Sequence, residues 1–184
     1  MMGKFAYVSF KVGAVLQLIA VIGLVFMFFN ANNLDALGVA FLFSLISAIV
    51  FVIAGVATKS IFSALSMIAK FFTLFGGFIF LITVFSYDPH ALSTNIINSN
   101  VDMIPAIVGT TVFESLVALR FIKIFKSKLF VLPLILTIIV LRFSKYIIAP
   151  VLTSYGLEAI LILLLKNPVK EVAKSNTTTT VSAS

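Results

Sequence analysis

The chain has 184 residues, of which 61% are hydrophobic and 10% are charged, and its formal net charge is +7. Soluble domains contain roughly 45–50% apolar and 25% charged residues, so this composition excludes a water-soluble globule. With no cysteine and one histidine, the chain lacks the ligands for disulfides, thiolate metal sites, thiol catalysis and a bis-histidine haem. We therefore expect no metal and no cofactor.

The apolar runs predict the fold class. A bilayer core about 30 Å thick needs about 20 apolar residues for each helix, which gives the chain room for five or six spans. We predict an all-α polytopic transmembrane helix bundle of six spans, with five as the alternative, over residues 1–166. Residues 167–184 form a polar tail that is too poor in apolar residues to fold alone. The protein would then be an integral, multi-pass protein of the cell membrane.

Two charge-free runs open the chain. The first predicted span is Phe5–Phe29, with Lys11 near its start, where the side chain can reach the lipid headgroups. This span is longer than the apolar region of about 7–15 residues in a cleaved signal peptide, so we interpret it as a retained anchor. The second span is Ala36–Thr58. A stripe of small residues in it would let another helix approach closely. The stripe consists of Ala40, Ser44 and Ala48.

The next two spans carry charges inside their apolar runs. Lys70 interrupts the third span, Ile61–Ser86, and Glu114 lies within the fourth, Met103–Phe125. One face of the third span carries small and polar residues three and four positions apart, so we expect this face to turn toward the protein interior. It consists of Ser63, Ser66, Lys70, Thr73 and Gly77.

A dense basic cluster lies at the end of the fourth span. Its members are Arg120, Lys123, Lys126 and Lys128. The cluster could bind an anionic lipid headgroup or an acidic loop of a partner. A loop that sets the topology is the simpler interpretation.

The last third of the chain allows two interpretations. We prefer two helices, Leu129–Leu141 and Ile147–Leu165, joined by a tight turn near Pro150. The rival is one full span, Leu129–Ala149, followed by a re-entrant or interfacial segment. The second of the preferred helices carries Glu158.

The basic residues orient the predicted bundle. With six spans and a cytoplasmic N-terminus, Lys70 stays in the membrane, and only Arg142 and Lys145 of the thirteen basic residues fall outside, so ten are cytoplasmic. This asymmetry follows the positive-inside rule, and it explains the net charge without a nucleic-acid partner. Arg142 and Lys145 could meet an anionic lipid or a partner subunit, although ordinary snorkelling is the simpler account.

Four predicted helices place a polar side chain near the middle of the membrane, counting about 1.5 Å per residue. These side chains are Gln17, Lys70, Glu114 and Glu158. Charges at that depth are costly unless they are paired or face water, and they commonly mark ion or proton pathways. The structural interpretation is a fixed Lys70–Glu114 pair, with Gln17 or Glu158 hydrogen-bonded to it. The functional one is a proton or ion pathway through Glu114 or Glu158, and a ligand or headgroup site is the third. Glu158, with no obvious second cation, is the hardest to explain as structure.

The sequence shows none of the common catalytic motifs. A Gly-x-Ser-x-Gly elbow, a His-Glu-x-x-His helix and a phosphate-binding Gly-x-x-x-x-Gly-Lys loop are all absent, so an enzyme is the weakest class and no catalytic residue is predicted. We expect a non-catalytic integral membrane subunit that contacts membrane lipids and assembles with other membrane proteins in a larger complex. The alternative is a small ion- or proton-coupled transporter or channel that uses the mid-membrane layer.

Overall fold

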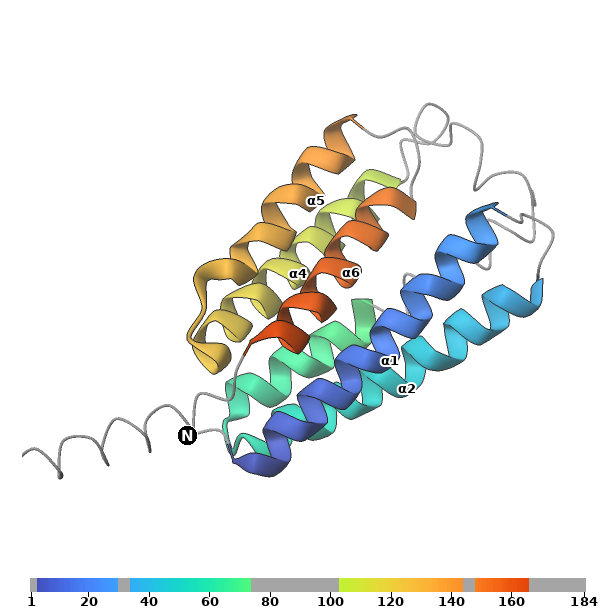
Figure 1. The fold of residues 1–184 in the computed structure, drawn as a ribbon. Coiled ribbons are helices and arrows are strands. Elements are labelled where there is room, and N and C mark those ends of the chain that lie inside the picture. The colour runs from blue at the N-terminus through green and yellow to red at the C-terminus, as the bar shows by residue number, and fades with distance from the viewer. Residues whose placement is uncertain (1–2, 30–33, 74–102, 144–147, 166–184) are drawn as a thin grey trace, which may run out of the picture.

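The described part of the chain is helical throughout. The computed structural model of the protein describes residues 3–29, 34–73, 103–143 and 148–165, which form helices and no strand. In chain order the helices are α1 Lys4–Phe29, α2 Leu34–Ala57, an unlabelled helix at Ile61–Thr73, α4 Met103–Phe125, the 3₁₀ helix η2 Lys128–Phe130, α5 Val131–Phe143 and α6 Ile148–Leu164 (Figure 1). The all-α part of the predicted fold class is thus confirmed.

The helix bounds follow the apolar runs closely. α1 begins one residue before the predicted first span, and α2 begins two residues before the predicted second. α4 has the predicted bounds. The third span is described as far as Thr73, so Gly77 and the rest of that span lie outside the described residues, as does the predicted tail.

Two separate helices occupy the last third of the described chain. α5 ends at Phe143, α6 begins at Ile148, and the two lie side by side (Figure 1). This agrees with the preferred interpretation and contradicts one span that continues to Ala149. The expected turn at Pro150 is wrong, because Pro150 is the third residue of α6. Its missing N–H has no helical partner in the first turn, so the proline is tolerated there.

The helices run alongside one another in one bundle (Figure 1). α1 packs along α2 and α6, and α5 packs along α6 and α4. The helix Ile61–Thr73 lies against α2 at Gly55, where an added Cβ would stand only 2.7 Å from Cγ of Met67. Gly55 therefore allows the close approach of these two helices.

The buried side of the helix Ile61–Thr73 differs by one position from the predicted face. Lys70 and Thr73 are buried as expected, and so is Ser63. The position expected for Ser66 is taken by Met67, which is fully buried, while the Ser66 hydroxyl donates to the Phe62 carbonyl at 2.7 Å. A serine that bonds to its own helix has no need of an interior partner.

Small residues bring α1 and α2 together. The Ser47 hydroxyl donates to the Gly13 carbonyl at 2.8 Å, and a Cβ on Gly13 would meet the Phe51 ring at 3.3 Å. The predicted small-residue stripe is buried at all three positions, which are Ala40, Ser44 and Ala48. The stripe is thus a packing element, as predicted. Because this chain itself covers the stripe, it is not free for a partner helix.

Phenylalanine rings fill the core near the start of α1 and the end of α4. The rings belong to Phe10 of α1, Phe51 of α2, Phe121 and Phe125 of α4, and Phe130 of η2. Centroids of the neighbouring rings lie 5.2 to 6.2 Å apart. Aromatic pairs at such distances add about 0.5–1.5 kcal/mol each beyond the area that they bury. This cluster therefore joins four elements at one end of the bundle.

The outer wall of the bundle is apolar. Exposed side chains of α1 recur at spacings of four and three, in the series Val8, Val12, Val15, Ile19, Ile22 and Phe26. Those of α2 do the same, in the series Val39, Leu42, Ile46, Ile49, Ile53 and Val56. Among the described residues two helical segments, Lys4–Phe26 and Gly38–Ala57, are long and apolar enough to cross a membrane.

Candidate functional site

Lys70 and Glu158 form an ion pair in the interior of the bundle. Lys70 is 0% exposed and Glu158 is 3% exposed. The lysine lies on the helix Ile61–Thr73 and the glutamate on α6, 88 positions further along the chain. Moving a charge out of water costs several kcal/mol unless a partner compensates it. Each of these groups is that partner for the other.

Three aromatic rings surround the Lys70 ammonium. Its Nζ lies 5.1 Å from the ring centroid of Phe51, 5.2 Å from that of Tyr155 and 5.8 Å from that of Phe121. A cation within about 6 Å of a ring centroid is attracted by the electron-rich ring face. Side chains of α2, α4 and α6 thus enclose one lysine.

Gln17 adds α1 to this network. Its Nε2 donates to the Tyr155 carbonyl at 2.7 Å and lies 3.4 Å from Oε2 of Glu158, the oxygen that pairs with Lys70. Its Oε1 is buried and has no hydrogen-bond partner among the described residues. The structure therefore brings Gln17, Lys70 and Glu158 together at one depth.

Glu114 lies beside this network but has different partners. Hydroxyl groups lie near both of its carboxyl oxygens: that of Thr73 at 3.4 Å from Oε1, and that of Ser154 at 3.5 Å from Oε2. The Tyr155 hydroxyl lies within hydrogen-bonding reach of Glu114 as well. The predicted Lys70–Glu114 pair is wrong, because Lys70 forms its ion pair with Glu158 of α6. The expectation that Glu158 lacks a cation is wrong for the same reason.

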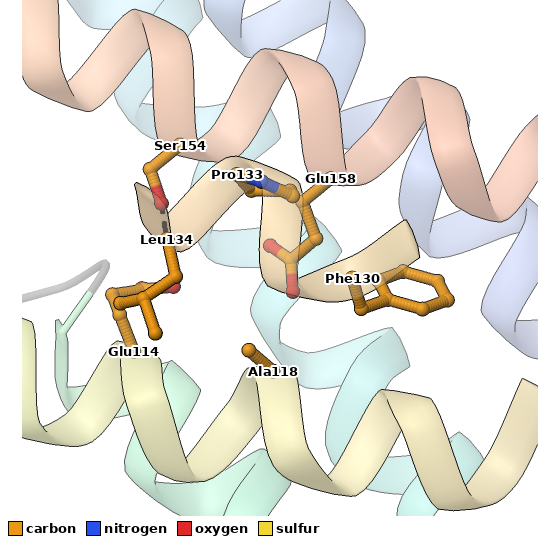
Figure 2. Close-up of a pocket in the computed structure, with 7 residues that line it drawn as sticks. All are labelled: Glu114, Ala118, Phe130, Pro133, Leu134, Ser154 and Glu158. Atoms are coloured by element: carbon orange, nitrogen blue, oxygen red, sulfur yellow. Dashed lines mark hydrogen bonds between the residues drawn. The ribbon is translucent and has the colours of Figure 1, made fainter. Parts of the chain in front are cut away.

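A small cavity separates the two carboxyl groups (Figure 2). It lies between α4, α5 and α6, and its lining consists of Glu114, Ala118, Phe130, Pro133, Leu134, Ser154 and Glu158. The cavity has room for about one water molecule. In Figure 2, Glu114 and Ala118 rise from α4 while Ser154 and Glu158 descend from α6, and a dashed line joins Ser154 to Glu114.

No protein family matches the chain, and no curated protein or solved structure is significantly similar to it. Only the groups themselves indicate what the network can do. Among the described residues, no three His, Cys, Asp or Glu side chains are grouped as a metal site would require. Two carboxyl groups beside one ammonium can hold and release a proton. They can also fix which helices are neighbours.

The predicted basic cluster divides into two parts. Arg120 is partly buried, and it donates from Nε to the Ser63 hydroxyl at 2.6 Å and from a terminal nitrogen to the Ser60 hydroxyl at 2.7 Å. Arg120 therefore fastens α4 to the start of the helix Ile61–Thr73. The remaining three side chains, Lys123, Lys126 and Lys128, are exposed. The side chains of Arg142 and Lys145, the other predicted lipid or partner contacts, lie outside the described residues.

Lys11 caps the last turn of α6. Its Nζ donates to the carbonyls of Leu163, at 2.6 Å, and Leu165, at 2.8 Å, and the Tyr7 hydroxyl donates to Leu165 at 3.1 Å. The Lys11 ammonium thus has hydrogen-bond partners within the protein, and its predicted reach to the headgroups stays a prediction. A helix C-terminus carries unpaired carbonyls and partial negative charge, and a lysine satisfies both.

Sequence reasoning missed the aromatic members of the network. Tyr155 is the most important of them, since its ring contacts Lys70, its carbonyl accepts from Gln17 and its hydroxyl is near Glu114. The spacing between Tyr155 and Glu158 is three residues, which places both on one helix face and could have indicated the tyrosine. No such signal marks Phe51 among the twenty phenylalanines of the chain.

Proposed function

We propose that the protein is a six-span integral protein of the cell membrane with a cytoplasmic N-terminus. The observation that carries this is its reversed polarity, with a lysine, two glutamates and a glutamine buried while valine, isoleucine and phenylalanine cover the outside. Such an apolar outer wall suits lipid and not water. The exposed lysines support the orientation, because they gather where α1 begins and α2 and α4 end. They are Lys4, Lys59, Lys123, Lys126 and Lys128.

We further propose that it acts as a non-catalytic membrane subunit that assembles with other membrane proteins. The described cavity has room for one water molecule and no organic substrate. The Lys70 ammonium is enclosed and paired, as suits a brace between helices. The apolar outer wall offers a surface to lipids and to helices of a partner.

The absence of cysteine makes a direct test of the topology possible. Single cysteines at Asn32 and Ser93 should react with an impermeant maleimide on intact cells. Those at Lys59 and Lys128 should react only after lysis. A cysteine at Ser175 distinguishes six spans from five, because the tail is protected with six and labelled with five. Labelling of the Lys59 and Lys128 positions on intact cells would refute the orientation.

Assembly is tested by purification from native membranes. Solubilised in a mild detergent, the tagged protein should migrate as a complex that contains other membrane proteins in fixed proportion. A lone monomer across several mild detergents would refute the subunit proposal.

Proton- or ion-coupled transport is the second candidate, and the cavity shared by Glu114 and Glu158 favours it. Carboxyl groups inside a membrane commonly carry the coupling proton or cation. Vesicles that contain the purified protein should then show proton or cation flux, and Glu114→Gln should abolish it. Absence of flux, or flux that persists in both Glu114→Gln and Glu158→Gln, would remove this candidate.

A further inference from the structure

The described buried network carries unequal numbers of acidic and basic groups. Two carboxyl groups, Glu114 and Glu158, face one ammonium, that of Lys70. With both glutamates ionised, the network would hold one uncompensated negative charge out of contact with water. Such a charge is too costly to persist when a proton can neutralise it.

The partners of the two carboxyl groups decide where this proton belongs. Glu158 faces the Lys70 ammonium and receives the Gln17 amide, both of which favour a carboxylate. Among the described residues, Glu114 has no charged hydrogen-bond partner: its partners are the hydroxyl groups of Thr73, Ser154 and Tyr155, and the Lys70 ammonium nearby is already paired with Glu158. From α5, the apolar Pro133 and Leu134 line the cavity. The one basic residue of α4 nearby, Arg120, is bonded to the serines at the start of the helix Ile61–Thr73.

Thr73 gives a second geometric reason. It has one hydroxyl hydrogen, and the Lys70 carbonyl at 2.9 Å is a nearer acceptor than Oε1 of Glu114 at 3.4 Å, while the Tyr155 hydroxyl is a further partner. While that hydrogen lies on the nearer carbonyl, the Thr73 oxygen is free to accept from a protonated Glu114. An ionised Glu114 would lose this contact.

A proton fits the site better than a metal cation. Sodium or calcium would need several oxygen ligands around one centre, and calcium takes six or more. Here Oε2 of Glu158 is already bonded to Lys70, and the cavity has room for about one water molecule. A proton needs one oxygen and no added volume.

We propose that Glu114 binds one exchangeable proton at neutral pH and that Glu158 stays ionised in its pair with Lys70. Protonation adds H⁺ to one Glu114 oxygen and makes the network Lys70–Glu158–Glu114 electrically neutral. The water-sized cavity lies against Glu114, so a water molecule in it could exchange the proton with this carboxyl group. This proton site rests on the membrane topology proposed above, and it deepens the transport candidate by naming the group that is loaded.

Infrared spectroscopy of the purified full chain tests this directly, because a protonated carboxyl absorbs apart from a carboxylate. Dodecyl maltoside is a suitable detergent, since it has no carbonyl group. At neutral pH the wild type should show one protonated carboxyl, whose band shifts in D₂O. Glu114→Gln should remove the band, and this near-isosteric change should keep the fold.

Two further variants count the charges. Lys70→Met should double the band, because Glu158 then has no ammonium and takes a proton too. Glu158→Gln should abolish it, because Glu114 then ionises to balance Lys70. Lys11→Met is the matched control: among the described residues that lysine contacts two carbonyls and the Tyr7 ring and no carboxyl group, so its loss should leave the band unchanged.

Several results would overturn the proton site. One is a wild type without the band, which would mean that both glutamates are ionised. Another is a band that survives Glu114→Gln, which would place the proton elsewhere. A band that does not shift in D₂O would contradict exchange. The band is read without any flux measurement, so a protein that shows it but moves no ions would refute transport and leave the proton site standing.

Discussion

Breaking the Lys70–Glu158 pair tests the buried network most directly. Removing one partner of a buried ion pair costs about 3–5 kcal/mol, because the other charge is left uncompensated. We expect Glu158→Gln to lower the free energy of unfolding by about 3 kcal/mol, at the low end of this range, since three rings still attract the ammonium and Glu114 can ionise to balance it. We expect about 3 kcal/mol for Lys70→Met also, since Glu158 can take a proton and the Gln17 amide still donates to it.

The double variant separates the pair from its surroundings. Lys70→Met with Glu158→Gln leaves neither charge behind, so the loss should be smaller than that of either single variant and far below the sum of about 6 kcal/mol. The shortfall from that sum measures the coupling between the two groups. Unfolding by SDS in mixed micelles, followed by circular dichroism, gives the four free energies.

A matched control and a clear refutation accompany this cycle. Lys123→Met removes an exposed lysine from α4 and should change stability by no more than about 0.5 kcal/mol. If the two single losses add to the double loss within about 0.5 kcal/mol, Lys70 and Glu158 are not coupled. The account of the network given above would then fail.

Three further changes test the packing of the bundle by the same unfolding assay. Gly55→Ala should cost about 1–3 kcal/mol, because its Cβ would stand 2.7 Å from Met67, whereas Gly38→Ala on the same helix has nothing within 4 Å and should be neutral or stabilising. Equal effects would contradict the close approach. Lys11→Met leaves the Leu163 carbonyl without its side-chain donor and the Leu165 carbonyl with Tyr7 alone, so it should cost about 1–3 kcal/mol, with faster hydrogen exchange at the end of α6 as the confirming signal. Arg120→Lys loses the fork that reaches two serines and should cost about 1–2 kcal/mol, and no loss would show that the fork is dispensable.

Much of the helical framework could be predicted because it depends on local quantities. Apolar length sets where a membrane-length helix begins and ends, and α4 has the predicted bounds for that reason. A constant rise per residue places Gln17, Lys70 and Glu158 at comparable depth, and the structure brings these three into contact. Pattern reasoning was also sufficient for the small-residue stripe of α2.

Which groups pair across helices could not be predicted in the same way. Lys70 could turn to Glu114 or to Glu158, and the choice depends on the rotation of three helices about their axes, which no local pattern determines. The one-position difference between Ser66 and Met67 on the inward face has the same origin. The aromatic rings around Lys70 could not be predicted for another reason. Hydropathy gives the same value to a phenylalanine that contacts an ammonium and to one that contacts lipid.

Because Lys70 is enclosed, one network can both hold the helices together and bind an exchangeable proton. An ammonium held by Glu158 and three rings cannot change partners without losing all of these contacts, so the pair is the fixed part. Among the described residues, the hydrogen-bond partners of Glu114 are neutral hydroxyl groups, those of Thr73 and Ser154 at 3.4 and 3.5 Å and that of Tyr155, and Glu114 borders the cavity. It can therefore change its charge without breaking the brace. The two carboxyl groups thus divide the two roles between them, with Glu158 as the structural group and Glu114 as the one that titrates.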